Sequence, residues 1–451
     1  MSEKEIRPQT MAAGGPGNGS SGNQLSSWQQ FIELMQRLKV REFLQKYTMI
    51  IALFAVIIAF GIMSDWKILS NKEITNLIGE NAYVFVLATG MLLCILTGGN
   101  IDLSVGSVVC FTGGIGCIMM TAGANMWLAV AVMLVTGLAI GVFQGFWIAK
   151  IRVPAFIATL AGMYAFRGIA SAILGGHRGS ADFSDFLQVF GVTKTSYIPD
   201  FMKNLLPNVE AAMINKESIW MHFLPGTNAN GLKTFNVTCM CIGIVVALVF
   251  IVLKVRKILV QKKMNISQSI PAQVITTVLI SLLVLWVCFD MSYYRGFPMV
   301  LVWVALVLGI YAYITNKTAI GRHLYAVGGN EKATALSGVK TRNVYWFAYA
   351  NIGLLAGLAG ILAAGYSKGI DPANAGDGYE MDAIAACFIG GASAYGGTGK
   401  VSGMIIGAIL MGIINKGMML INVEANYQRV VKGLVLLIAV LFDVLSKRQK
   451  R

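Results

Sequence analysis

The chain has 451 residues, of which 56% are hydrophobic and 13% charged, and it carries a formal net charge of +15. Soluble domains carry about 25% charged residues, so this composition excludes an ordinary water-soluble enzyme. The apolar residues come in blocks of about 20, the length of a membrane-spanning helix rather than of a barrel strand, and predict an all-α, polytopic helical membrane protein.

Residues 1–46 precede the first apolar block. Residues 1–24 are mostly polar and small, which favours a disordered tail, and no apolar region follows the charged start as it would in a secretory signal. The next stretch, SSWQQFIELMQRLKVREFLQKY, is amphipathic and basic towards its end, a pattern typical of a helix at a membrane surface. We assign 1–46 to a cytoplasmic tail and an amphipathic interfacial helix.

Apolar blocks separated by polar residues predict about 10 to 12 transmembrane helices within one domain at 47–446. The blocks lie at 47–64, 75–97, 101–122, 126–149, 154–174, 236–256, 270–290, 297–315, 343–365, 380–397, 401–419 and 428–446. Two of them, 101–122 and 380–397, are rich in glycine and interrupted by polar residues. We expect broken or re-entrant helices there, because irregular backbone is tolerated in a membrane only where protein or water lines it.

The distribution of lysine and arginine predicts which loops face the cytoplasm. With the amino terminus inside, the inner loops carry basic clusters at 150–152, 254–263 and 317–342, and the chain ends on a basic tail at 447–451. The segment 175–235 falls outside, where it is either a partner-docking cap or a connector with interfacial helices. Both termini are expected in the cytoplasm, and the net charge needs no nucleic acid to explain it.

Cysteine and histidine give no catalytic or metal-binding pattern. The seven cysteines are scattered through the apolar blocks and odd in number, so no disulfide framework is predicted. Cys239 and Cys241 form a C-x-C pair, but no histidine or second pair stands near to complete a metal site. His177, His222 and His323 are too far apart for a metal site or a proton relay, so we expect no bound metal and no hydrolase activity.

Polar residues at the junction of two apolar blocks are the first candidates for a solute path. The sequence ILTGGNIDLSVGSVV places Asn100, Asp102 and Ser104 where one helix breaks and the next begins. Asp102 near the positive end of the new helix suits a helix cap. The alternative is a polar lining of a translocation path, since charged residues within spans are costly and often mark function.

A second candidate group lies near the end of the chain. Glu380 and Asp382 open a short glycine-rich block and are further candidates for the translocation path, while Arg429 and Lys432 lie near the outer end of the last block. We predict that Lys432 pairs with Glu380 or Asp382, because a lone charge at that depth is penalised. Arg167 has no evident partner in the sequence.

The segment GGASAYGGTGKVS at 390–402 resembles a nucleotide-binding P-loop but departs from it. A P-loop would need glycine at position 394 and serine or threonine at 401, and this chain has Ala394 and Val401. Apolar blocks flank the segment on both sides, whereas a P-loop joins a strand to a helix. We predict instead a hinge at which two short helices turn and pack closely through small residues.

A cytoplasmic loop at 317–342 holds a short predicted helix. Within NKTAIGRHLYAVGGNEKATALSGVKTRN, Asn330 suits an N-cap, Glu331 the first turn and Gly338 the position after the helix. GRHLYAVGG leads into it with an exposed aromatic residue and a flexible pair of glycines. A short helix presented to the cytoplasm suits docking into a groove on another protein.

Three stretches together resemble a known family, and they occur in its order: GNIDLSVGSVV, GRHLYAVGGNEKATALSGVKTRN and GYEMDAIAACFIGGASAYGGTGKVSG. They resemble the permease subunits of bacterial sugar importers of the ATP-binding-cassette (ABC) class, nearest to the ribose, galactose, xylose and multiple-monosaccharide permeases. The resemblance extends from Tyr47 to Asp443 and implies a permease of the cell inner membrane that moves a monosaccharide. It also implies four partners, namely an ATPase subunit that holds ATP and Mg²⁺, a periplasmic binding protein, a second permease copy and membrane lipid.

The resemblance further implies that the loop from Gly321 to Gly338 is the coupling helix that touches the ATPase subunit. The candidate coupling residues are Gly321, Arg322, Tyr325, Gly328, Gly329, Asn330, Glu331, Ser337 and Gly338. Motion of this helix would rock the permease between outward and inward openings, because packed interfaces have discrete arrangements. The chain itself would then be no enzyme and would bind no cofactor.

Two departures from the shorter family members bear on the cargo. The segment 236–290 adds two spans with a basic inner loop, which resembles the longer xylose and multiple-sugar branch. The outer insert also departs from the shorter members. The main alternative, an ion-coupled secondary transporter, predicts acidic residues near mid-membrane on several spans and no docking loop. A membrane scaffold or receptor, and an importer permease for an autoinducer or nucleoside, are further alternatives.

Overall fold

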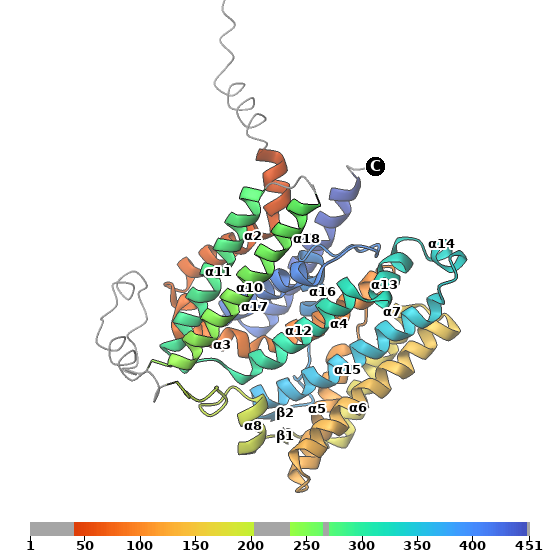
Figure 1. The fold of residues 1–451 in the computed structure, drawn as a ribbon. Coiled ribbons are helices and arrows are strands. Elements are labelled where there is room, and N and C mark those ends of the chain that lie inside the picture. The colour runs from red at the N-terminus through yellow and green to blue at the C-terminus, as the bar shows by residue number, and fades with distance from the viewer. Residues whose placement is uncertain (1–39, 203–234, 265–269, 449–451) are drawn as a thin grey trace, which may run out of the picture. The chain divides into compact units, whose positions relative to one another are not determined.

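The computed structural model describes residues 40–202, 235–264 and 270–448 (Figure 1). The chain forms two compact units, residues 1–51 and 52–451, and the first is described only as the helical stretch 40–51. The predicted disordered tail, most of the predicted interfacial helix, His222 and residues 449–451 of the basic tail therefore lie outside the described residues.

The described elements follow one another almost entirely as helices (Figure 1). They are α2 (Val40–Met63), η1 (Lys67–Leu69), α3 (Asn71–Glu80), α4 (Ala82–Leu96), α5 (Val105–Thr121), α6 (Met126–Gly145), η2 (Phe146–Ile151), α7 (Ala155–Ile173), β1 (Gly179–Ser180), α8 (Ser184–Phe190), α10 (Val237–Lys263), α11 (Ile270–Ser292), α12 (Met299–Lys317), α13 (Ala319–Gly329), α14 (Glu331–Leu336), α15 (Thr341–Ser367), β2 (Gly369–Ile370), α16 (Tyr379–Ile389), α17 (Val401–Leu420) and α18 (Ala425–Arg448).

The predicted all-α membrane fold is confirmed. In the described part of the chain, 7 helices are long and apolar enough to cross a membrane, or up to 8 if the bent pair α3 and α4 forms one span. The axes of α3 and α4 differ by 42°. The two glycine-rich blocks that were expected to be interrupted correspond to α5, which begins only at Val105, and to α16, which ends at Ile389 before an irregular turn.

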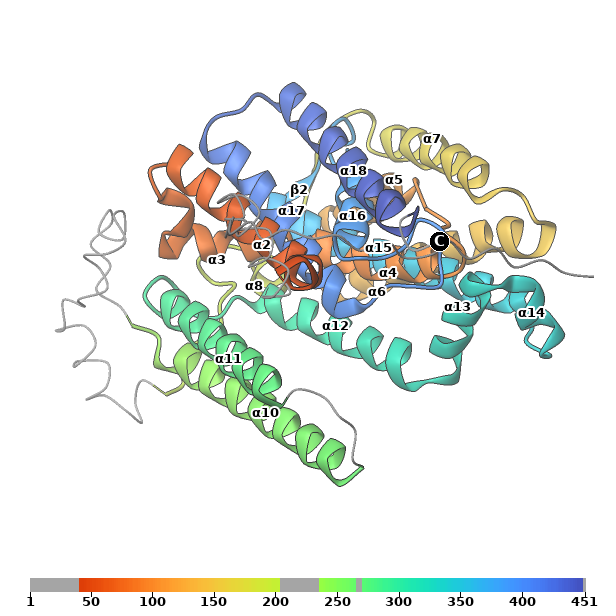
Figure 2. The same ribbon diagram turned by 90° about the horizontal axis from the view of Figure 1, so that it is seen from above.

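Helix α15 lies at the centre of the second unit and packs against α4, α5 and α6 (Figure 2). Every residue of α4 except Tyr83 is buried. A helix that is apolar all round belongs in the interior, so α4 and α15 form the core on which the polar segments are mounted.

Helices α6 and α15 meet backbone to backbone through glycine. A Cβ atom on Gly137 would overlap the Gly353 carbonyl oxygen, and a Cβ on Gly141 would overlap that of Tyr349. Gly353 and Gly357 of α15 face the same seam from the other side. Small residues allow such close approach between membrane helices, where van der Waals packing replaces the hydrophobic effect as the driving force.

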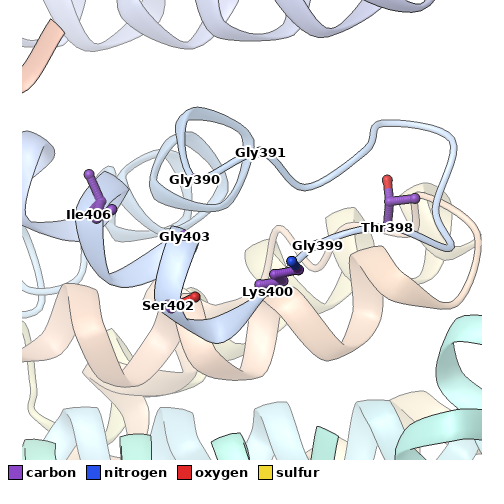
Figure 3. A pocket seen from close by; sticks show the side chains of 8 residues that line it. All are labelled: Gly390, Gly391, Thr398, Gly399, Lys400, Ser402, Gly403 and Ile406. Carbon is purple, nitrogen blue, oxygen red and sulfur yellow. The ribbon is translucent and has the colours of Figure 1, made fainter. Parts of the chain in front are cut away.

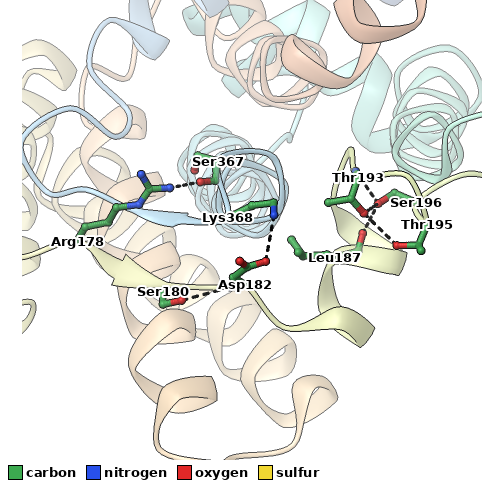
Figure 4. A network of polar contacts seen from close by, with 9 residues as sticks. All are labelled: Arg178, Ser180, Asp182, Leu187, Thr193, Thr195, Ser196, Ser367 and Lys368. Carbon is green, nitrogen blue, oxygen red and sulfur yellow. Dashed lines mark hydrogen bonds and ion pairs between the residues drawn. The ribbon is translucent and has the colours of Figure 1, made fainter.

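The far end of α15 is fastened to the segment that precedes α8 (Figure 4). Strands β1 and β2 pair antiparallel, with Gly179 opposite Ile370. Arg178 donates to the Ser367 carbonyl, and Lys368 Nζ lies 3.3 Å from Asp182 Oδ1. We refer to this region as the β1–β2 end of the molecule.

Helices α10 and α11 form a hairpin, which Figure 2 shows as two adjacent helices. They pack chiefly on each other and, beyond the hairpin, on α3. Cys239, Cys288 and Met291 form a small core of their own, with Ile78 and Phe297 against it. The hairpin corresponds to the two spans expected from the apolar blocks 236–256 and 270–290.

Candidate functional site

Three glycine-rich segments that are distant in the sequence meet at the end of α15 opposite β1 and β2. They are the break after α4, helix α13, and the turn 390–400 between α16 and α17. Gly397 N donates to the Leu96 carbonyl oxygen at 3.1 Å. Tyr325 Oη donates to the Gly399 carbonyl oxygen at 2.8 Å. The three stretches that carry the family resemblance therefore form one contiguous structure.

Glycine is required at this junction because the backbones touch. A Cβ on Gly328 would overlap both the Leu96 carbonyl oxygen and Gly397 N. Gly99 has a φ of +76°, which L side chains rarely adopt, and a Cβ there would overlap the Ala394 carbonyl oxygen. Any larger residue would displace α13 from the turn.

The turn 390–400 has an internal structure of its own (Figure 3). Ser393 N donates to the Thr398 carbonyl oxygen at 2.9 Å, and Ala394 N donates to Asp443 Oδ2 of α18 at 3.0 Å. Beside it lies a hollow of about 340 Å³, lined by Gly390, Gly391, Thr398, Gly399, Lys400, Ser402, Gly403 and Ile406. Helices flank the turn on both sides, and a Cβ on Gly403 would overlap the Gly390 carbonyl oxygen, which fits a tight helix-to-helix turn rather than a P-loop.

Helix α14 is short and capped as its sequence indicates. The Asn330 side chain accepts a hydrogen bond from Ala333 N at 3.0 Å, and Gly338 follows the helix with a φ of +85°. Leu336, the last residue of α14, is 90% exposed. The helix therefore presents one large apolar side chain outward on a rigid, capped turn.

Glu331 fixes α14 to the rest of the chain. Its carboxylate lies 2.8 Å from the Arg152 guanidinium and accepts hydrogen bonds from Thr341 Oγ1 and Tyr345 Oη, each at 3.1 Å. Partial burial raises the pKa of Glu331, but the hydrogen bonds from Arg152, Tyr345 and Thr341 outweigh it and hold the pKa below its ordinary value. Glu331 thus faces its own chain and braces the exposed helix.

The remaining predicted coupling residues divide into packed and exposed positions. Gly321 is buried, because a Cβ there would overlap the carbonyl oxygens of Ile314 and Thr315 in α12. Arg322, Gly329 and Ser337 are exposed. The exposed positions and Leu336 form the outward surface of the loop.

Asn100, Asp102 and Ser104 lie at the start of α5. Asp102 is buried, and its Oδ1 accepts from Ser104 N at 2.8 Å and Ser104 Oγ at 2.7 Å. Ser104 Oγ also exchanges hydrogen bonds with Gln144 of α6, and Asn100 Nδ2 donates to the Thr97 carbonyl oxygen at 3.3 Å. These contacts tie the segment before α5 to α6, and no side chain caps the first turn of α5.

Asp382 gathers contacts from three other helices. It is fully buried, and its Oδ2 accepts from Lys432 Nζ of α18 at 2.8 Å, Tyr83 Oη of α4 at 2.7 Å and Asn415 Nδ2 of α17 at 3.2 Å. Of the two acids considered for Lys432, the structure brings Asp382 to it. Glu380 lies instead beside Gly106 of α5.

A second buried ion cluster escaped the sequence interpretation. Lys416 of α17 is 5% exposed and lies 2.5 Å from Glu73 and 2.9 Å from Glu80, both on α3. The signal was present, because Glu73 and Glu80 are seven residues apart and share one helix face, and Lys416 interrupts an apolar block. Arg167, for which no partner was evident, donates to the carbonyl oxygens of Pro372 and Ala375.

Within the described residues, no group of three or more histidine, cysteine or acidic side chains is arranged to hold a metal ion. The arrangement instead suits the transmission of movement. Helix α14 is exposed and held by Glu331, and the adjacent α13 contacts the end of α4 and the turn between α16 and α17, which is bonded to α18.

Comparisons with known proteins place these features in context. The family described as "Branched-chain amino acid transport system / permease component" matches residues 73–440. The chain is 33% identical over 411 residues to the xylose transport system permease protein XylH of Escherichia coli (strain K12). The aligned region covers 90% of this chain and 93% of that protein. The chain is 31% identical to XylH of Haemophilus influenzae over 414 residues (90% and 98%), and 30% identical to the ribose import permease protein RbsC of E. coli K12 over 417 residues (92% and 98%). No solved structure matches the chain.

Proposed function

Because the chain belongs to the branched-chain amino acid transport system / permease component family, we propose that it is the membrane-spanning permease subunit of an ABC importer for a monosaccharide. The relatives that align with about nine-tenths of this chain are named for the transport of xylose and ribose, two sugars of the same size class. They favour a neutral, hydroxyl-rich cargo over the amino acids in the family's description.

The observation that carries the proposal is the α13–α14 loop. The one large apolar side chain of α14, Leu336, is 90% exposed, and α14 is capped by Asn330 and held in place by Glu331. An exposed leucine on a rigid helix does not stabilise the monomer. A helix that docks in a groove on another protein needs both an exposed apolar side chain and a fixed backbone. We assign the groove to an ATPase subunit, with Gly321, Arg322, Tyr325, Gly328, Gly329, Asn330, Glu331, Ser337 and Gly338 as the coupling segment.

The contacts of α13 supply a route from that loop into the membrane domain. Tyr325 and Gly328 contact the turn 390–400 and the end of α4, and Ala394 in the same turn is bonded to Asp443 of α18. A displacement of α13 is thereby passed to the turn between α16 and α17. Close-packed contacts transmit it because they have discrete arrangements and little compressibility.

The remaining partners follow from the same proposal. ATP and Mg²⁺ belong to the ATPase subunit, so this chain is a transport subunit that binds no cofactor and recognises no nucleic acid. A periplasmic binding protein delivers the sugar, a second copy of the chain completes the passage, and membrane lipid surrounds both. The protein lies in the bacterial inner membrane with both termini and the α14 loop in the cytoplasm.

Two sets of paired charges in the membrane domain favour this proposal over an ion-coupled secondary transporter. Asp382 is paired with Lys432, and Glu73 and Glu80 share Lys416. Acidic groups that already pair with a buried lysine are poorly suited to carry a coupling ion. We keep Asn100, Asp102, Ser104, Glu380 and Asp382 as the candidate residues of the translocation path.

The test is uptake by proteoliposomes that contain the permease with its ATPase partner, with xylose- or ribose-loaded binding protein outside and ATP inside. Radiolabelled sugar should accumulate only when the ATPase, ATP and the binding protein are all present. Uptake that persists without the ATPase, or that follows an imposed proton or sodium gradient, would refute the importer proposal.

A further inference from the structure

Two cysteine thiols lie together inside the α10–α11 hairpin. Cys239 stands in the first turn of α10 and is 1% exposed, and Cys288 stands near the end of α11 and is 7% exposed. Cys239 Sγ donates to the Cys288 carbonyl oxygen at 3.5 Å, and both side chains belong to the small core of the hairpin. They are separated by 49 positions in the chain, so the hairpin fold alone brings them together.

The backbone around the pair holds the two helices close. Gly243 lies one turn beyond Cys239, and a Cβ on it would stand 2.6 Å from Cys288 Cβ. Asn236 N donates to the Ser292 carbonyl oxygen at 2.9 Å, and Ser292 Oγ donates to the Cys288 carbonyl oxygen at 2.7 Å. The thiols therefore lie where α10 and α11 pack closely against each other.

The charges of the hairpin indicate which compartment this end faces. The opposite end carries Lys254, Arg256, Lys257 and Lys263. The thiol end is mixed in charge, with Asp290, Arg295 and Asp200, which caps α10 through Val237 N and Thr238 N. Basic residues mark the cytoplasmic end of a helical hairpin. The thiol end thus faces the periplasm, which is kept oxidising. This step rests on the membrane orientation given under the proposed function.

We propose that Cys239 and Cys288 are a disulfide-forming pair, oxidised in the mature protein. The oxidant is a disulfide-bearing thiol oxidase of the periplasm. One thiol loses its proton and attacks a sulfur of the oxidant's disulfide, which breaks that bond and forms a mixed disulfide. The second thiol loses its proton and attacks the chain's sulfur, so the Cys239–Cys288 bond forms and the oxidant leaves as two thiols carrying both electrons and both protons. Because the thiols are buried once α10 and α11 have packed, the exchange takes place as the hairpin assembles.

This pairing revises the expectation drawn from the cysteine count. An odd number of scattered cysteines argued against a framework of disulfides, and it still does, since the bond closes a single hairpin. Cys241, two residues from Cys239, has an intermediate exposure and does not belong to the small core of the hairpin. It provides a matched control within the same turn of the same helix.

The test is a thiol count on the full-length protein, purified in detergent without reductant and denatured in the presence of a maleimide. Of the seven cysteines, two should be protected, so intact mass should show five labels before reduction and seven after it. Cys239→Ser and Cys288→Ser should each show six labels with or without reductant. Cys241→Ser should show four labels before reduction and six after it. Reductant should lower the thermal unfolding temperature of the wild type and of Cys241→Ser, and leave that of Cys239→Ser unchanged.

Seven labels on the unreduced wild type would overturn the proposal, because no thiol would be protected. Two protected thiols in Cys239→Ser would also overturn it, because a different pair of cysteines would then form the disulfide. Sugar uptake is an independent readout. ATP-driven uptake by a protein with seven free thiols would refute the disulfide and leave the importer function standing. A protected pair in a protein that transports nothing would refute the function alone.

Discussion

Tyr325 of α13 donates its hydroxyl hydrogen to the carbonyl oxygen of Gly399, 74 positions further along the chain, at 2.8 Å. This bond joins the predicted coupling loop to the turn that superficially resembles a P-loop. If the turn moves with α13, removal of the bond should loosen the coupling without unfolding the protein.

Tyr325→Phe tests that link directly. The variant keeps the ring and loses one neutral hydrogen bond, which contributes about 1 kcal/mol, a factor of about five in an equilibrium. We expect sugar transported per ATP hydrolysed to fall by about that factor, while the affinity for the ATPase subunit stays the same. An unchanged ratio of sugar to ATP would remove this bond from the coupling route.

Gly328→Val should be far more disruptive than Gly329→Ala. A side chain at Gly328 would enter the Leu96 carbonyl and Gly397 N, whereas nothing lies within 4 Å of a Cβ on Gly329. Overpacking costs about 1–3 kcal/mol, which corresponds to about a tenfold loss of ATP-driven uptake at equal membrane expression. Uptake and expression assays on both variants check this, and equal activity of the two would contradict the close packing.

Leu336→Asp should weaken the docking of the ATPase subunit. Leu336 is 90% exposed, so its replacement leaves no cavity in the folded chain. The loss of a leucine that is buried at the interface costs about 1.5–3 kcal/mol of binding free energy. The ATPase concentration at half-saturation should rise by about tenfold or more in a pull-down titration, with thermal unfolding unchanged. Leu336→Met is the matched control and should bind normally; equal binding by the aspartate variant would place the interface elsewhere.

Glu331 gives a pH dependence with a defined sign. Its pKa is held below the ordinary glutamate value, so its bracing of α14 is fully present above about pH 4.3 and is lost as pH falls through the lowered value. Wild-type ATPase docking should therefore weaken only in that acid range, as followed by binding in liposomes.

Glu331→Gln should dock less tightly than wild type at neutral pH and lose the acid-dependent weakening. Glu331→Lys should be weaker still, because it faces Arg152, whereas Lys332→Glu on the exposed side is the control for a change of charge. An acid-dependent loss of the same size in Glu331→Gln would assign the titration to another group.

Lys432→Met should destabilise the membrane domain strongly. It leaves the fully buried Asp382 carboxylate without its ammonium partner, and breaking a buried pair costs about 3–5 kcal/mol. The double variant Lys432→Met with Asp382→Asn should be less destabilised than the sum of the single variants. Thermal unfolding in detergent measures both, and strict additivity would show that the two side chains do not interact energetically.

Local sequence chemistry sufficed for some of these features. The capping pattern around Asn330 and Gly338 predicted α14, because a cap depends on residues three or four positions apart. Lys432 was matched to two neighbouring acids because a buried lysine needs one. The glycines of the turn 390–400 indicated a tight helix-to-helix turn once the P-loop spacing failed.

Contacts that depend on how the helices are arranged in space could not be predicted from the local sequence. The bond from Tyr325 ends on a backbone carbonyl, which any residue type at position 399 would supply. Lys416 meets two acids on α3 across more than 300 positions, and a single lysine in an apolar block does not identify them. Arg152 and Glu331 were both placed in inner loops, but loop charge alone does not pair them.

The glycine seam between α6 and α15 also limits how this protein can change. At an ordinary helix interface, a residue that becomes larger is accommodated when its neighbour becomes smaller. Gly137 and Gly141 face Gly353 and Gly357, so both sides already carry the smallest residue there is. No compensating substitution exists across this interface, and variation must be confined to the helix faces that point away from it.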